Sequence, residues 1–116
     1  MIKIKLLEYN LHRNETTFRY YSENQDLFRE VGIDFTTSDD YDIAFVGQAS
    51  IIDKKLSIDE SIEKGLDFVS RIKGDYIIVD GQDSTTLMGT IDVFRESSAK
   101  LFLKTVYLND FNLYKK

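Results

Sequence analysis

Apolar and polar residues alternate at the start of the chain. Ile2, Ile4 and Leu6 are apolar, and Lys3 and Lys5 stand between them. Because successive side chains of a strand point to opposite faces, this period-two pattern is typical of a half-buried or edge strand. The sequence therefore predicts a first strand that begins at Ile2.

Compact apolar runs predict the other strands. Residues 43–46 (IAFV) and 76–79 (YIIV) are runs of this kind. Strands of a parallel sheet that are covered on both faces have this composition. Residues 33–36 and 101–103 predict two shorter strands.

Helices are predicted between the strands. Residues 22–25 (SENQ) fit a capping box and predict a helix over residues 23–31, with Gly32 as its carboxyl-terminal cap. Residues 57–60 (SIDE) form a second capping box, with acids in the first turn where the helix dipole favours them. The helix that follows should end at Gly74, and one apolar face is predicted at helical spacing: Ile58, Ile62, Leu66, Val69 and Ile72.

A third helix is predicted near residue 90. Leu87, Met88, Ile91 and Phe94 suggest its apolar face, with Asp83 or Ser84 as its amino-terminal cap. Alternation of strands and helices indicates right-handed crossovers and a parallel sheet. The fold class predicted for residues 1–116 is α/β: a single Rossmann-like three-layer domain with a mostly parallel sheet of about five strands and helices on both faces.

The length and net charge of the chain exclude several classes of protein. The 116 residues are enough for one domain, and the net charge of −5 argues against nucleic acid as a partner, since nucleic-acid binders carry basic patches. No apolar run approaches the roughly 18 residues of a membrane span, and the start lacks a signal-peptide pattern. The absence of cysteine excludes disulfides and thiolate metal sites. We therefore expect a cytoplasmic protein.

Ligands of open parallel sheets bind beyond the carboxyl ends of the strands, and this rule selects three segments. In the first, His12 is the only histidine and could act as a general base, with Arg13 beside it to hold an anionic group. Both residues could equally be solvated loop residues. In the second, Gly47 allows close backbone approach and Gln48 and Ser50 offer hydrogen bonds, although a tight turn explains the same residues.

The third segment follows residues 76–79. Asp80 and Asp83 could bind a hard cation or hydrogen-bond sugar hydroxyls, and Gln82 and Ser84 offer further polar groups. As a helix cap, Asp83 would have a sufficient structural role, whereas Asp80 and Gln82 are left without one. Replacing Asp80 by asparagine is therefore expected to leave folding largely intact.

Three segments resemble the amino-terminal half of GT-B-type glycosyltransferases. They are DYDIAFVGQAS (residues 40–50), GDYIIVDGQDS (74–84) and AKLFLKTVYLNDFNLYKK (99–116). In that family a strand of the type yDiifvg, a strand end of the type iDGqD and a strand of the type lyfKr.yl recur in this order. The resemblance covers residues 40–116.

The resemblance implies a Rossmann-like domain on the acceptor side of a cleft. A second, carboxyl-terminal domain would bind most of the nucleotide-sugar, and no metal or other cofactor would be needed, which weakens the cation interpretation. Inverting members take a base from the amino-terminal domain, and His12 and Asp83 are the candidates here. An isolated 116-residue chain is then expected to be inactive.

Two hypotheses remain open from the sequence. The chain could be the acceptor-side half of a glycosyltransferase, completed by a second domain or another chain, with a saccharide acceptor or nucleotide-sugar as ligand. It could instead be a non-catalytic α/β binding or protein-interaction module, which could self-associate. The sequence identifies neither the sugar nor the acceptor.

Overall fold

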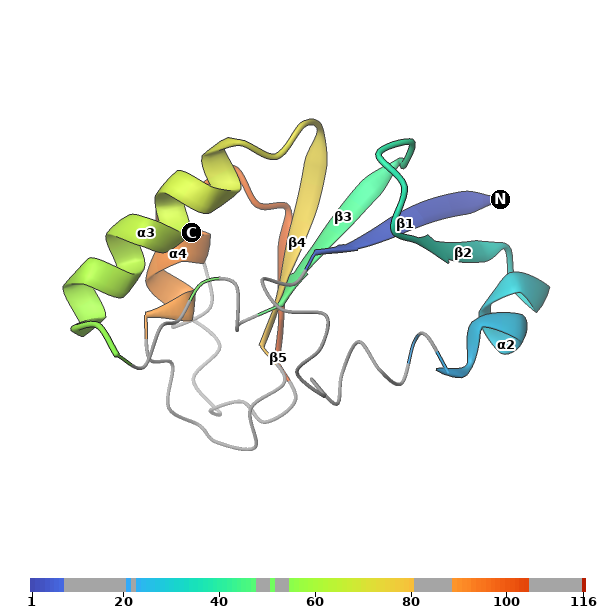
Figure 1. Ribbon diagram of the computed structural model, residues 1–116, viewed down its shortest axis with the longest axis horizontal. Helices are drawn as coiled ribbons and strands as arrows, with labels where there is room; N and C mark the ends of the chain where they lie inside the picture. The colour runs from blue at the N-terminus through green and yellow to red at the C-terminus, as the bar shows by residue number, and fades with distance from the viewer. Residues whose placement is uncertain (8–20, 22, 48–50, 52–54, 81–88, 105–115) are drawn as a thin grey trace.

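One parallel sheet with helices on both faces forms the described part of the chain (Figure 1). The structure is a computed structural model, and it describes residues 1–7, 21, 23–47, 51, 55–80, 89–104 and 116. Its elements confirm the predicted α/β class. They are β1 (Ile2–Leu7), α2 (Gln25–Glu30), β2 (Ile33–Thr36), β3 (Ile43–Gly47), α3 (Ile58–Ser70), β4 (Asp75–Asp80), α4 (Thr90–Glu96) and β5 (Leu101–Lys104).

The strand order is β2-β1-β3-β4-β5, and all four neighbouring pairs are parallel. The chain thus builds outward from β1 to β2 on one side, and then through β3, β4 and β5 on the other. In open sheets the crevice beyond the carboxyl ends at such a reversal is the usual place for a ligand. Here the reversal lies between β1 and β3.

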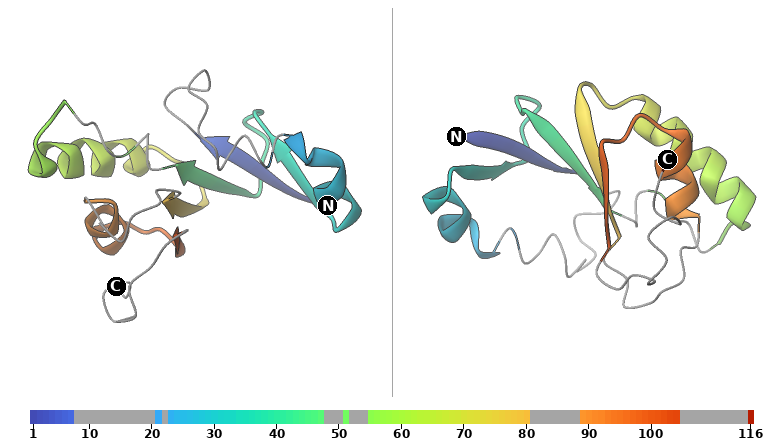
Figure 2. Two further views of the ribbon diagram at one scale, coloured as in Figure 1. Left: turned by 90° about the horizontal axis from the view of Figure 1, so that it is seen from below. Right: turned by 180° about the vertical axis from the view of Figure 1, so that it is seen from behind.

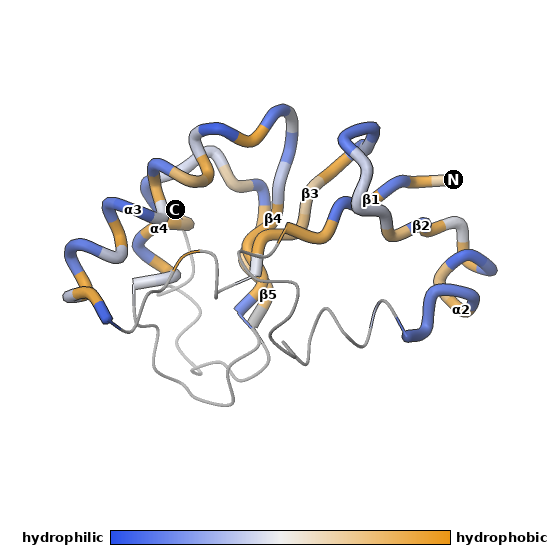
Figure 3. The backbone as a smooth tube through the Cα atoms, viewed as in Figure 1, coloured by the Kyte–Doolittle hydropathy of each residue, from blue (hydrophilic) through white to orange (hydrophobic). Residues whose placement is uncertain are grey.

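Two hydrophobic cores lie on opposite faces of the sheet, and β4 contributes to both. Tyr76 and Ile78 belong to the core that also contains residues of α3 and α4. Ile77 and Val79 belong to the other core, which packs against Phe28 of α2. Figures 2 and 3 show the helices on their two sides and the apolar centre of the sheet. Burial on both faces is what the compact apolar run of β4 predicted.

Helix α2 is shorter than predicted and is not capped as predicted. Its amino-terminal cap is Asn24, which makes no side-chain cap hydrogen bond. The Gln25 side chain instead bonds the backbone of Phe35 in β2, donating to its carbonyl at 2.6 Å and accepting from its N–H at 3.3 Å. Because β2 is an edge strand, this amide satisfies backbone groups that a further strand would otherwise pair. Ser22, the other half of the predicted box, lies outside the described residues.

Helix α3 begins as predicted, because the Ser57 hydroxyl accepts a hydrogen bond from the Glu60 N–H at 3.2 Å. It ends at Ser70, and Gly74 occupies a turn before β4 with φ of 81°. Four of the five residues of the predicted apolar face pack on the core: Val69 is buried, and Ile62, Leu66 and Ile72 lie partly buried against it. Ile58, the first residue of the helix, is instead 58% exposed. The buried positions also include two small residues that the apolar pattern did not mark, Ser61 and Gly65.

Helix α4 also differs from its prediction. It begins at Thr90, and its amino-terminal cap is Gly89, with φ of 86°. Neither Asp83 nor Ser84 therefore caps this helix, although both residues themselves lie outside the described ranges. Ile91 and Phe94 are buried, as the apolar pattern predicted.

The connection from β2 to β3 is a short loop that crosses β1. Parallel crossovers usually need a dozen or more residues and contain a helix. Here β2 ends at Thr36, level with Lys5, and β3 begins at Ile43, level with Ile4. Residues 37–42 must therefore span only the width of β1, about 10 Å from β2 to β3. They contain no helix, so this connection brings no helical cover to β1.

Ion pairs hold the crossover loop against β1. The Lys3 ammonium lies 2.8 Å from Asp40, and the Lys5 ammonium pairs with Asp39. Asp42 donates its N–H to the Lys3 carbonyl at 2.9 Å and accepts from the Lys3 N–H through its carboxylate at 2.8 Å. Acidic loop residues thus bind the basic residues that the alternation of the first strand placed on one face.

The two lysine–aspartate ion pairs should stabilise the fold least at very low and very high pH. The hydrogen bond from Lys5 lowers the pKa of Asp39 below 3.8, and that from Lys3 likewise lowers the pKa of Asp40. Their contribution is complete above pH 3.8 and is lost as the pH falls through the lowered values. Asp40 in turn raises the pKa of Lys3 above 10.5, and that contribution is lost as the pH rises through the raised value.

The measurement is urea unfolding as a function of pH, with the double variant Asp39→Asn, Asp40→Asn as control. We expect the stability difference between parent and variant to shrink as the pH falls below 3.8 and through the lowered pKa values, because the two carboxylates of the parent then become protonated. Its size should be small, because the carboxylates are exposed and screened by solvent. A difference that stayed constant down to the acid transition would show that the ion pairs do not stabilise the loop.

Candidate functional site

Two of the predicted site residues are described, and they lie at the carboxyl ends of neighbouring strands. Gly47 is the last residue of β3 and is level with Val79 of β4, and Asp80 is the next residue. The adjacency of the two strand ends follows from the parallel pairing of β3 with β4. The remaining predicted residues lie outside the described ranges: His12, Arg13, Gln48, Ser50, Gln82, Asp83 and Ser84.

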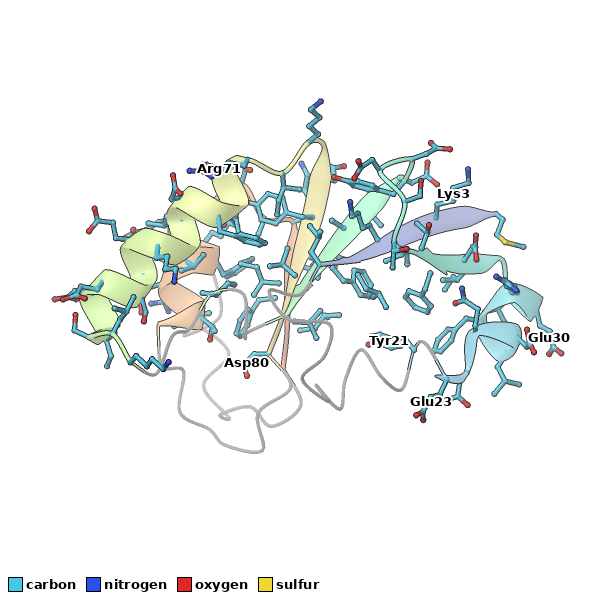
Figure 4. All side chains as sticks on the ribbon, viewed as in Figure 1. Lys3, Tyr21, Glu23, Glu30, Arg71 and Asp80 are labelled. Atoms are coloured by element: carbon cyan, nitrogen blue, oxygen red, sulfur yellow. The ribbon has the colours of Figure 1, made fainter. Side chains whose placement is uncertain are left out.

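Asp80 is fully buried, with 0% of its surface exposed. The hydroxyl of Thr90, also buried, donates a hydrogen bond to its Oδ2 at 2.8 Å. A buried carboxylate needs such partners, because removal from water is costly. The structure therefore gives Asp80 a structural contact, which corrects the sequence-based expectation that it had none. Figure 4 shows the residue at the carboxyl end of β4.

Thr90 was not identified from the sequence. The predicted helix began near residue 84, so position 90 belonged to its interior and carried no signal of its own. In the structure Thr90 is the first residue of α4.

The bond between Asp80 and Thr90 joins two ends of one segment. Asp80 ends β4, Thr90 begins α4, and residues 81–89 connect them. The predicted ligand residues Gln82, Asp83 and Ser84 belong to that connection. Through this hydrogen bond Asp80 holds the end of β4 close to the start of α4. We therefore regard Asp80 as a positioning residue for the connection between them.

Ile51 anchors the segment that follows β3. Its side chain is 2% exposed and belongs to the core beneath α3. It lies against Gly65, where an added Cβ would stand 2.9 Å from Cγ2 of Ile51. The absence of a side chain at Gly65 thus lets Ile51 pack against α3.

A cation site is not formed by the described residues, which include no group of three or more His, Asp or Glu side chains able to hold a metal ion. Asp80 belongs to the described set, but Asp83 does not. The hypothesis that these two carboxylates bind a cation therefore stays a prediction. What the described geometry offers is a buried carboxylate–hydroxyl pair at the strand end.

The fold and this strand-end site define a Rossmann-like α/β domain. Comparison with protein-family models, with curated proteins and with solved structures finds no match for the chain. In the described parts of the chain, no helix has the length and apolar character needed to cross a membrane.

Proposed function

We propose that this chain is the acceptor-side half of a GT-B-type glycosyltransferase, which transfers sugar from a nucleotide-sugar to a saccharide acceptor. The observation that carries the proposal is the pairing of β3 with β4. Two of the segments that resemble this family, residues 40–50 and 74–84, contain these neighbouring strands. The strand ends within those segments, Gly47 and Asp80, are therefore neighbours at the carboxyl edge of one sheet, which is the edge where ligands of open parallel sheets bind.

We assign each residue of the proposed site a role at the carboxyl edge of the sheet. Gly47 allows a ligand to approach the backbone of β3, and Gln82 and Ser84 supply hydrogen bonds to sugar hydroxyls. His12 or Asp83 would act as the base that activates the acceptor. Asp80 supports the segment through its hydrogen bond from Thr90, at 2.8 Å, and is not assigned direct contact with the acceptor.

A saccharide acceptor should raise the melting temperature of this chain by mass action. A ligand at a hundred times its Kd adds about 2.7 kcal/mol to the stability of a single-site protein. That corresponds to a shift of roughly 10 °C for a domain of this size. Nucleotide-sugars should have a smaller effect, because the donor would bind mainly to the second domain. The measurement is differential scanning fluorimetry with a panel of saccharides and nucleotide-sugars.

Variants then assign the effect to the strand-end site. Gln82→Ala and His12→Ala should reduce the shift, whereas Lys64→Ala, on the exposed side of α3, should retain it. If no saccharide and no nucleotide-sugar changes the melting temperature, the glycosyltransferase proposal fails. The alternative, a non-catalytic α/β binding or interaction module, is favoured by the burial of Asp80, which gives one strand-end acid a purely structural use.

A further inference from the structure

An open groove of about 560 Å³ lies on the α3 side of the sheet. Its volume is within the range of roughly 300–1,000 Å³ that small-molecule sites occupy. Its apolar lining comes from Leu7 of β1, Tyr41 of the crossover loop, Phe68 of α3 and Ile72, which follows α3. Tyr41 donates its hydroxyl to the Lys73 carbonyl at 3.0 Å, which fixes the ring at the edge of the groove.

The groove exists because the β2-to-β3 crossover is a loop. Residues 37–42 cross β1 without forming a helix, so the α3-facing side chains of β1 have the loop on one side and α3 on the other. Lys5 and Leu7, two apart on a strand, share this face. In Figure 4 Arg71, which lines the groove, lies toward the top of the view, and Asp80 lies lower, at the carboxyl end of β4. None of the described residues that line the groove belongs to β3 or β4, whose ends form the strand-end site.

Positive charge converges on the groove although the chain carries a net charge of −5. Lys5, Arg71 and Lys73 line it, against one acid, Asp39. Arg71 pairs with Asp67 at 2.9 Å, and both side chains are largely exposed. The lining thus has a local excess of cations beside two aromatic rings.

Lys5 and Asp39 are unequally buried, and this difference points to a ligand. The Lys5 side chain is 16% exposed, with its ammonium 5.5 Å from the centre of the Tyr41 ring. Asp39, which pairs with it, is 98% exposed. A largely covered lysine side chain therefore has its charge neutralised by a carboxylate on the surface of a loop. Another anion of suitable shape could take the place of that carboxylate at little structural cost.

We propose that this groove binds a small amphipathic anion, a flat apolar ring system that bears one carboxylate, sulfonate or phosphate group. The ring system lies on Tyr41 and Phe68, and the anionic group displaces Asp39 from Lys5. Arg71 and Lys73 add long-range attraction for the same charge. This proposal does not depend on the glycosyltransferase proposal, because it uses none of the strand-end residues.

The probe is 8-anilinonaphthalene-1-sulfonate, with the uncharged N-phenyl-1-naphthylamine as its matched control. The chain has no tryptophan, so probe fluorescence is read without that background. We expect saturable one-site binding of the sulfonate and weaker binding of the neutral compound. Asp39→Asn should tighten sulfonate binding several-fold, since the competing carboxylate is gone. Lys5→Met should weaken it about tenfold or more, the usual scale for a lost charge-assisted hydrogen bond.

Further variants separate binding from loss of structure. Lys5→Arg keeps the charge and should retain most of the affinity, and Arg71→Gln should weaken binding less than Lys5→Met. Lys64→Gln, on the same helix as Phe68 but outside the groove, should change nothing. Melting curves of every variant identify those that bind the probe because they have unfolded. Equal affinity for the neutral compound, or sulfonate binding that neither Asp39→Asn nor Lys5→Met alters, would overturn the proposal.

Discussion

Replacing Gly65 by leucine should lower the free energy of unfolding by about 3 kcal/mol, toward the upper part of the range for overpacked cores. A Cβ at this position would stand 2.9 Å from Cγ2 of Ile51 and 3.1 Å from Cγ2 of Val93. Both neighbours are β-branched and cannot move aside by a simple rotamer change. Leucine is a better helix former than glycine by roughly 1 kcal/mol, so a loss cannot be attributed to helix propensity. The measurement is the midpoint of urea unfolding.

Two controls isolate the crowding at Gly65. Glu63→Leu introduces the same side chain at an exposed position of α3 and should change stability by no more than about 0.5 kcal/mol. Gly65→Leu combined with Ile51→Ala and Val93→Ala should cost less than the sum of the separate effects, because the truncations open the space that leucine needs. A Gly65→Leu protein as stable as the parent would mean that α3 does not pack against Ile51 and Val93 in this way.

Removing the hydroxyl that holds Asp80 should have the next largest effect. Thr90→Val keeps the shape of the side chain and removes the donor to Oδ2 of Asp80, at 2.8 Å in the parent. Because both residues are fully buried, water cannot replace the lost bond. We expect a loss of about 2 kcal/mol, the usual scale for removing a buried hydrogen bond to a carboxylate. The same unfolding experiment measures it.

A double-mutant cycle tests whether the two residues act as a pair. Asp80→Ala and Thr90→Val should together cost less than the sum of their separate effects, by about 1 kcal/mol or more. Asp80→Asn retains an acceptor and should cost less than Asp80→Ala, although burial makes it more harmful than a surface change. Thr37→Val, an exposed substitution of the same type, should be nearly neutral. Additive single effects would show that the hydrogen bond contributes nothing to stability.

Local sequence patterns correctly predicted those elements that depend on contacts between neighbouring residues. The compact apolar runs of residues 43–46 and 76–79 became β3 and β4, since burial on both faces requires apolar residues throughout. The Ser57 cap was also predictable, because a serine hydroxyl and the N–H three residues later are close in any helix that begins there. In these places no distant part of the chain competes for the same groups.

Predictions were wrong where a distant segment competes. Gln25 could have completed a capping box, but its amide bonds Phe35 of the edge strand β2, ten residues away. Helix α3 packs most of its predicted apolar face on the core, but it also buries Gly65, because the close contact with Ile51 and Val93 leaves no room for a larger side chain there. Hydrophobic periodicity predicts that apolar positions are buried. It does not predict that a glycine is buried where two segments pack closely together.

The sequence by itself determined the α/β class, the strands of the sheet and the carboxyl ends at which ligands of such folds bind, because these depend on periodicity and on chain direction. Only the tertiary structure decided that Asp80 is buried against Thr90, since burial depends on which helix covers the strand end. Only the tertiary structure revealed the groove beside β1. The stagger of β2 and β3 lets a short loop replace a crossover helix, and no pattern within residues 37–42 encodes that stagger.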